Sequence, residues 1–167
     1  MHFADVHFGV ENYGRFDPKT GLPSRLMDFR DALNSAIDIA LAADIELAVF
    51  AGDAYKTRDP NQTHQRELAA CLSKITERGI PFVMLAGNHD IPNTRGRANS
   101  IEIFGALAGR YLRVFDTPAV EVVETSKGNR VQIAAMPYLI KSLVLAREEH
   151  KDKGVQDTTQ LIVEKHT

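Results

Sequence analysis

The residues best suited to chemistry lie in three short polar clusters. Asp5 and His7 are two positions apart, Asp53 follows a glycine, and residues 87–90 read Gly-Asn-His-Asp. Carboxylates, imidazoles and an amide oxygen form a mixed ligand set that suits Mn, Fe or Zn better than Ca or Mg. Two such ions about 3.5–4 Å apart can clamp a phosphate and activate a water. The clusters are therefore consistent with a two-metal site for the hydrolysis of phosphate esters.

The third cluster suggests a division of roles. Asn88 is a candidate metal ligand, and His89 beside it is placed to protonate a leaving alkoxide. Asp90 is a candidate for fixing the tautomer and orientation of that imidazole. Taken singly, Asp-x-His and Gly-Asp also fit ordinary turns, whereas three ligand-type side chains in a row rarely serve a turn. The specific signal is that all three clusters come at the ends of predicted strands.

The elements that must position these clusters are read from apolar runs and from apolar residues spaced by three and four. The pattern predicts strands over 1–4, 45–51 and 80–86, and helices over 24–43, about 60–79 and about 99–108. Asp59 before Pro60 is expected to cap the second helix, and Gly79 to end it. An extended backbone at Asp5 and His7 would point both side chains to one side.

The second half of the chain shows a different pattern. Strands are predicted over 112–115, 119–124 and 130–135, and the last two are expected to form a hairpin through 126–129. Helices are predicted over 139–149 and from 157 to the end. The whole order indicates an α/β layer fold whose first three strands are parallel. Their carboxyl ends would then bring the three polar clusters to one edge of the sheet.

Composition limits the function classes. The 167 residues are enough for about one domain, and the net charge of −2 argues against attachment to nucleic acid by bulk charge. A nuclease is not excluded, because a metal site brings its own positive charge. The single cysteine, Cys71, allows no intrachain disulfide, which suits a reducing compartment. With no signal peptide or membrane-length apolar run visible, we expect a cytoplasmic chain without membrane contact.

These residues resemble the calcineurin-like metallophosphoesterase superfamily, whose motif order is Asp-x-His, Gly-Asp, Gly-Asn-His-Asp/Glu, a lone His and Gly-His-x-His. Within it, the chain resembles SbcD-type DNA-repair nucleases. The residues that carry this closer resemblance are Ala4–Gly9, Arg25, Asp28, Phe29, Ala32, Leu33 and Asp90.

The resemblance implies a β-sandwich flanked by helices, in αββα layers, and two divalent metal ions, usually Mn²⁺. Its implied site assigns Asp5 and His7 to the first metal, Asp53 to both, Asn88 to the second, His89 as catalytic acid and Asp90 as its orienting partner. The implied activity is 3′→5′ exonuclease and endonuclease action on DNA ends. The implied partners are DNA, an SMC-like ATPase subunit of the SbcC type and a second copy in a homodimer.

Two departures from the family pattern are visible. Lys56 stands where the family often has an acid, three residues after Asp53. After Asp90, no segment matches the lone His or Gly-His-x-His, since His150 and His166 are the only later histidines. We therefore expect residues 1–167 to be one metallophosphoesterase nuclease domain, C-terminally incomplete and ending before its last metal-ligand motifs. Such a chain is expected to bind Mn²⁺ weakly, at fewer than two sites, and to be inactive alone.

Two alternatives stay open at this point. One is another calcineurin-like enzyme, such as a phosphatase or a cyclic-nucleotide phosphodiesterase. The other is a non-catalytic fragment that dimerises or docks a partner through its helices.

Overall fold

The computed structural model describes residues 1–10, 12–92, 96–107 and 109–139. The chain divides into two compact units, Met1–Pro137 and Tyr138–Thr167, and the fold below is that of the first. The helices predicted over 139–149 and 157–167 lie outside the described residues, apart from Leu139.

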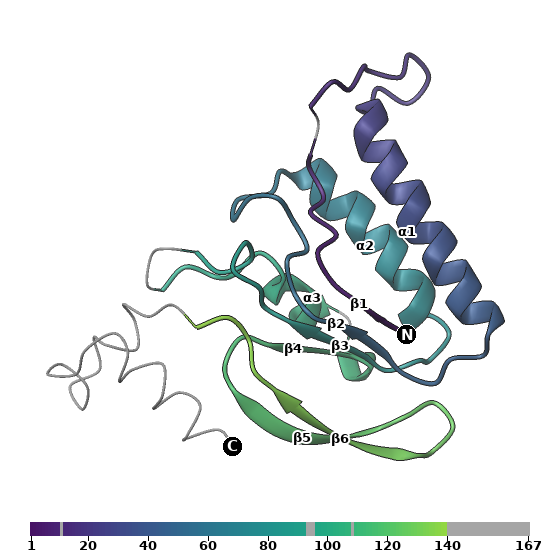
Figure 1. The fold of residues 1–167 in the computed structure, drawn as a ribbon, viewed down its shortest axis with the longest axis vertical. Helices are drawn as coiled ribbons and strands as arrows, with labels where there is room; N and C mark the ends of the chain where they lie inside the picture. Colours follow the sequence, from purple (N-terminus) through teal and green to yellow (C-terminus); the bar gives the residue numbers. More distant parts are fainter. Residues whose placement is uncertain (11, 93–95, 108, 140–167) are drawn as a thin grey trace, which may run out of the picture. The chain divides into compact units, whose positions relative to one another are not determined.

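The centre of the first unit is a parallel sheet of four strands (Figure 1). Its strands are β1 (His2–Phe3), β2 (Ala48–Phe50), β3 (Phe82–Leu85) and β4 (Leu112–Phe115), in the order β1-β2-β3-β4. Phe50 of β2 is in register with Met84 of β3, which pairs in turn with Val114 of β4. The parallel arrangement predicted for the first three strands is confirmed, and β4 joins them as a fourth.

Helices cover one face of this sheet (Figure 1). The helices are α1 (Ser24–Ala42), α2 (Gln62–Thr76) and the short α3 (Glu102–Leu107), followed by one 3₁₀ turn at Gly109–Tyr111. Apolar side chains three or four positions apart form a stripe on each long helix, and burying that stripe stabilises the helix. Leu33 and Ile37 of α1 are buried in the same core as Phe82 and Met84 of β3.

A two-stranded antiparallel hairpin covers the other face. It consists of β5 (Ala119–Glu124) and β6 (Arg130–Ala135), with the bounds predicted from the sequence. Val83 of β3 is buried with Val123 of β5 and Ala135 of β6, whereas its neighbours Phe82 and Met84 face the helices. Because successive side chains alternate between faces, β3 is apolar on both sides. The described layers are helix, parallel sheet and hairpin, so the predicted α/β fold class is confirmed.

The start of α2 differs from the prediction. Asn61, not Asp59, is the N-cap, and its side-chain oxygen accepts a hydrogen bond from the backbone N–H of His64 at 2.9 Å. Asp59 instead forms an ion pair with Arg97 from the loop after β3. The carboxylate of Asp59 is thus paired with a cation distant in sequence, and the side chain of Asn61 caps the helix instead.

None of the described helices is both long and apolar enough to cross a membrane.

Candidate metal centre

The three polar clusters meet at the carboxyl edge of the sheet because the loops after β1 and β2 continue side by side. The backbone N–H of Asp5 donates to the Gly52 carbonyl at 3.0 Å, and that of His7 donates to the Asp53 carbonyl at 3.1 Å. One residue on, Phe8 is buried and bridges to the second loop as a strand would. These bonds fix the first cluster against the second.

Two glycines let the second and third loops approach each other closely. A Cβ added to Gly87 would lie 2.2 Å from Asp53 Oδ1 and 2.4 Å from the Asp53 backbone nitrogen. A Cβ added to Gly52 would lie 2.8 Å from both the Cα and the nitrogen of Gly87. Any side chain at either position would push the loops apart, because real Cβ atoms do not approach backbone so closely. The glycines before Asp53 and Asn88 therefore have a steric purpose.

The backbone at three predicted ligands is in the left-handed region. The φ angles are 56° at Asp5, 49° at His7 and 61° at Asp53. Among the described residues only Tyr13 and Asp44 join them as non-glycine residues with positive φ. Such conformations cost free energy and cluster at functional sites. The extended backbone expected at Asp5 and His7 is therefore wrong, since β1 ends at Phe3 and the chain then turns.

Three side chains from the three clusters form one group. Ligand atoms of His7, Asp53 and His89 all lie within 4.8 Å of one another. His7 Nε2 is 3.9 Å from Asp53 Oδ2, and the two imidazole rings meet edge to face with centroids 5.0 Å apart. All three side chains are half-buried. The structure thus brings together residues that are far apart in the sequence.

The other two predicted ligands lie around this group. Asp5 Oδ1 is 3.5 Å from His7 Nε2, but its side chain is 72% exposed. Asn88 is half-buried on the third loop between Gly87 and His89. His89, which was predicted as the acid, belongs to the converging group, whereas Asp5 does not. The roles assigned to Asp5, His7, Asp53, Asn88 and His89 all stay predictions.

The imidazole of His89 is oriented by a main-chain carbonyl. Its Nδ1 lies 2.7 Å from the backbone oxygen of Lys56, and its own backbone N–H donates to Asp53 Oδ1 at 2.9 Å. A carbonyl oxygen can only accept, so Nδ1 carries the hydrogen of this contact. Nε2 is then the ring nitrogen that remains to bind a ligand or to transfer a proton. In the sequence Lys56 stands out only as a departure from the family pattern, because a main-chain contact leaves no residue-type signal.

Asp90 does different work from that expected. It is fully buried, and its Oδ2 accepts from the backbone N–H groups of Asp53 at 2.8 Å and Gly87 at 2.9 Å. Its Oδ1 accepts from the Ala54 N–H at 3.0 Å and the Ser100 hydroxyl at 3.2 Å. With both oxygens taken by these donors, Asp90 fastens the second loop to the third. The direct pairing with the His89 imidazole is not what the structure shows, and its effect on that ring runs through the backbone.

The environment of Asp90 sets two opposing influences on its charge. Burial raises the pKa of Asp90, while the three backbone N–H donors lower it. The neighbouring phenol of Tyr55 is also fully buried, and burial together with the Asp90 charge raises the pKa of Tyr55. Tyr55 therefore stays neutral and fills the core beneath the loops. Its role was missed in the sequence, where a tyrosine after Gly-Asp-Ala carries no distinctive signal.

The group fits a divalent cation by donor type and spacing. Two imidazole nitrogens and a carboxylate oxygen converge, and Mn, Fe and Zn accept such a mixed set. Their ligand atoms lie within 4.8 Å of one another, which is close to the largest separation, about 4.6 Å, of two ligands of one ion at metal–ligand distances of about 2.0–2.3 Å. The geometry supports a divalent metal site, and it does not select the metal.

Comparisons with known proteins agree with the motif order. The profile of the calcineurin-like phosphoesterase family matches residues 1–160. The chain is similar to the DNA double-strand break repair protein Mre11 of Thermoplasma acidophilum, with 34% identity over 96 residues, or 58% of this chain and 24% of that protein. It is also similar to the SbcD component of the SbcCD nuclease of Bacillus subtilis, with 29% identity over 145 residues, or 83% of this chain and 33% of that protein.

A third relative is matched over nearly the whole chain. The Mre11 protein of Methanococcus maripaludis is 24% identical over 158 residues, which cover 95% of this chain and 40% of that protein. The matched segments thus span between a quarter and two fifths of these three relatives. With the family profile covering nearly all of its length and the family's first three motifs gathered at one sheet edge, the chain belongs to the calcineurin-like phosphoesterase family.

Proposed function

We propose that the protein is a metal-dependent nuclease that hydrolyses phosphodiester bonds at DNA ends. The observation that carries this proposal is the convergence of His7, Asp53 and His89 in a chain of the calcineurin-like family. The printed names of the relatives, a DNA double-strand break repair protein and a nuclease component, favour DNA as the substrate. Because this chain matches only part of those proteins, activity, substrate and partners are all part of the proposal.

The proposed metal centre holds two divalent ions, with Mn²⁺ as the first choice. His7 and Asp5 would bind the first ion, Asp53 both ions and Asn88 the second. When bound, the ions would supply positive charge to the phosphate and activate a water for attack. The left-handed backbone at Asp5, His7 and Asp53 supports this assignment, because strain of that kind persists where function requires it.

The proposed acid is His89, acting through Nε2, so that of the three converging side chains only His7 and Asp53 would bind metal. The Lys56 carbonyl holds the hydrogen on Nδ1 and so fixes the ring, which leaves Nε2 to carry the proton given to the leaving oxygen. The Asp53 carboxylate accepts from the His89 backbone and so keeps that ring beside the proposed metal ligands. Asp90 contributes by fastening the loops that carry Asp53 and His89.

The test compares two substrates in the presence of Mn²⁺. We expect the chimera described next to cleave an end-labelled DNA duplex, with little turnover of a small phosphomonoester such as p-nitrophenyl phosphate, and this chain alone to be inactive on both. The assay uses this chain and a chimera in which the residues after Pro137 come from the Bacillus subtilis relative, since no Gly-His-x-His follows Asp90 here. Turnover of the phosphomonoester alone, by either protein, would rule against a nuclease and favour a phosphatase.

Asp53→Asn is the diagnostic variant, because it keeps the oxygen that accepts from His89 and removes the charge. Its matched control is Asp44→Asn, since Asp44 has a similar φ of 54° but follows α1, on the loop that leads into β2. Both variants are made in the chimera, where we expect Asp53→Asn to abolish cleavage and Asp44→Asn to leave it unchanged.

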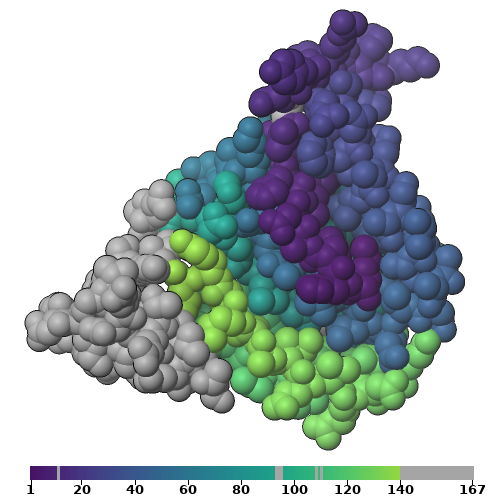
Figure 2. Space-filling model, in the orientation of Figure 1, coloured from purple at the N-terminus to yellow at the C-terminus, as the bar shows by residue number. Residues whose placement is uncertain are grey.

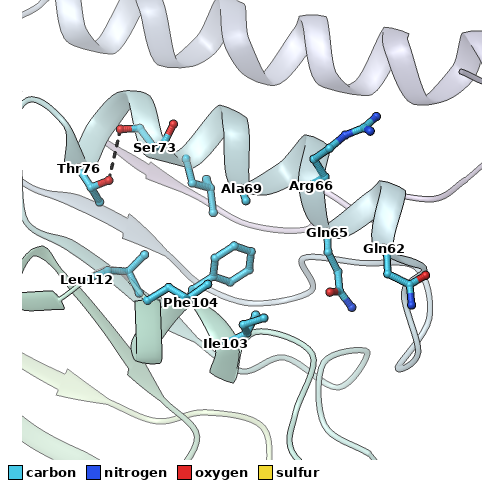
Figure 3. A pocket seen from close by; sticks show the side chains of 11 residues that line it. Gln62, Gln65, Arg66, Ala69, Ser73, Thr76, Ile103, Phe104 and Leu112 are labelled. Carbon is cyan, nitrogen blue, oxygen red and sulfur yellow. Dashed lines mark hydrogen bonds between the residues drawn. The ribbon is translucent and has the colours of Figure 1, made fainter. Parts of the chain in front are cut away.

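We also propose a homodimer that uses an apolar groove between α2 and α3 (Figure 3). The groove has a volume of about 410 Å³ and is lined by Ala69 and Leu72 of α2 and by Phe104 and Ile103 of α3. Leu107 at the end of α3 lines it as well and is 77% exposed. Apolar side chains left in water around a groove favour association with a like surface.

The dimer is tested by sedimentation at several concentrations. Leu107→Asp is expected to shift the protein towards monomer, because it would place a charge in the apolar groove. Ile39→Asp is the control, since Ile39 is similarly exposed but lies on α1, away from the groove. Equal effects of the two variants would contradict a dimer at α2 and α3. An SMC-like ATPase remains the proposed second partner.

A further inference from the structure

An arm formed by residues 12–23 presents two aromatic side chains to solvent. The arm lies in the sequence between the first polar cluster and α1. It projects past the amino end of that helix, at the top of the view (Figures 1 and 2). Tyr13 is fully exposed and Phe16 is 76% exposed, the highest values among aromatic residues in the part of the chain that is described. Neither ring belongs to a core cluster, so packing within the fold does not account for them.

The arm is held in shape by its own hydrogen bonds. At its base, the Ser24 backbone N–H donates to the Arg15 carbonyl at 2.7 Å, and the Asp17 N–H donates to the Leu22 carbonyl at 2.9 Å. At its tip, the Asp17 carboxylate accepts from the Thr20 N–H at 2.9 Å, and such backbone donors lower the pKa of Asp17. The two rings are therefore carried on a defined hairpin-like turn rather than on a loose tail.

The charges of the arm complement an anion. Arg15 and Lys19 are both exposed, and Asp17, the one acid within residues 12–23, has its carboxylate engaged by the turn. Aromatic rings interleaved with cations are the combination that binds single-stranded nucleic acid, because bases stack on the rings and phosphates meet the cations. A protein partner would favour an apolar patch free of charge, whereas the exposed cations Arg15 and Lys19 flank Phe16 in the sequence.

We propose that this arm binds unpaired bases of the DNA substrate by stacking on Tyr13 and Phe16, with Arg15 and Lys19 supplying the charge for the backbone. The inference rests on the proposed function, since the same DNA would reach the metal centre. Tyr13 follows His7 by six residues, so the chain can separate their Cα atoms by no more than about 22 Å. An unwound or frayed DNA end of a few nucleotides can therefore contact the arm and the metal centre together.

The test measures DNA binding without hydrolysis. Fluorescence anisotropy in EDTA follows a labelled oligothymidylate and a blunt duplex of the same length, with the whole 167-residue chain. The double variant Tyr13→Ala/Phe16→Ala is expected to weaken binding of the single strand at least about 25-fold, from about fivefold or more for each lost stack. Tyr13→Phe/Phe16→Tyr is expected to bind like the wild type, because it keeps both rings.

The control removes exposed apolar side chains elsewhere. Ile39→Ala/Val120→Ala changes one residue of α1 and one of β5, both exposed, and is expected to leave binding unchanged. Arg15→Gln/Lys19→Gln is expected to weaken both DNA forms and to reduce the dependence of affinity on salt. None of these side chains is buried, so we expect each variant to keep the fold. Circular dichroism of each variant checks this.

The outcomes separate the arm from the nuclease itself. If the chimera cleaves DNA with Mn²⁺ but the double alanine variant binds the single strand as tightly as wild type, the arm proposal is overturned and the nuclease proposal stands. Equal loss of single-strand and duplex binding would also overturn stacking on bases. If the wild type binds no DNA and cleaves only the phosphomonoester, both proposals fail.

Discussion

The two edges of the parallel sheet use polar residues in opposite ways. At the amino end of β2, the turn of the hairpin docks on the loop after α1, and its polar groups satisfy one another. Glu46 accepts from the Thr125 hydroxyl at 2.6 Å and the Asn129 amide at 2.7 Å, while Lys127 pairs with Asp44 at 2.7 Å. These bonds lower the pKa of Glu46 and raise the pKa of Lys127. The polar residues at this edge therefore hold the hairpin turn against the loop after α1.

At the carboxyl edge, by contrast, side chains converge with their ligand atoms facing one another. His7, Asp53 and His89 come within 4.8 Å, and the hydrogen bonds that hold them go mainly through backbone groups. The side chain that is fully satisfied there, Asp90, lies behind this group. Around Glu46 the hydrogen-bonding atoms are taken up by one another at 2.6–2.7 Å, which indicates structure, whereas the ligand atoms of His7, Asp53 and His89 converge within 4.8 Å and leave space for an ion.

Asp90→Ala should have the largest effect on the carboxyl edge. It would leave the buried N–H groups of Asp53, Ala54 and Gly87 without their acceptor, at a cost of about 4 kcal/mol in the free energy of unfolding. Urea unfolding followed by circular dichroism measures it. Asp116→Ala, at an exposed acid after β4, is the control and should cost under about 1 kcal/mol. Equal losses would show that Asp90 is not the fastening of the two loops.

Gly87→Ala should come next. The new Cβ would overlap the backbone and carboxylate of Asp53, so the loops must separate, and we expect a loss of about 2–3 kcal/mol with impaired Mn²⁺ binding. Gly128→Ala in the hairpin turn is the matched control, because no atom lies within 4 Å of its added Cβ. Its positive φ of 82° should cost only about 1 kcal/mol. A Gly87→Ala protein as stable as the control would refute the close approach.

Asp53→Asn should affect metal and leave the fold intact. We expect Mn²⁺ affinity, measured by calorimetry, to fall at least about tenfold, or about 1.4 kcal/mol. Unfolding free energy without metal should stay within about 0.5 kcal/mol of wild type, because the acceptor for the His89 N–H is retained. Unchanged Mn²⁺ affinity would remove Asp53 from the proposed ligands. Two tight Mn²⁺ sites in the wild-type chain would contradict the expectation of fewer than two.

Glu46→Gln should have the smallest effect, seen mainly in pH dependence. The folded protein holds the Glu46 pKa below its ordinary value of 4.5, so its contribution to stability is present above about pH 4.5 and is lost as the pH falls through the lowered pKa. The variant should therefore be slightly less stable at neutral pH and lose less stability on acidification. Parallel urea titrations from about pH 7 to about pH 3 measure this, and Mn²⁺ binding should not change. Identical pH profiles would show that the Glu46 contacts carry no charge-dependent stability.

Much of the architecture was predictable because periodicity reports which side chains are buried. The hairpin bounds, the parallel order of the first strands and the helices α1 and α2 all follow from apolar spacing. Helix ends were less predictable. Asp59 and Asn61 both have side chains that can cap α2, but Asn61 is the cap and Asp59 pairs with Arg97 of another loop. A competition between local and distant partners is invisible in a linear sequence.

At the metal centre, the sequence by itself determined which residue types reach the carboxyl edge of the sheet, and in which order. Asp5, His7, Asp53 and residues 87–90 all follow predicted strands, and parallel strands end at one edge. Only the tertiary structure decided how each residue is used there. The left-handed turns at Asp5, His7 and Asp53, the carbonyl of Lys56 on His89, and the burial of Asp90 among backbone donors depend on loops from three strands packing together. Main-chain groups are alike at every position, so contacts made through them have no signature in the sequence.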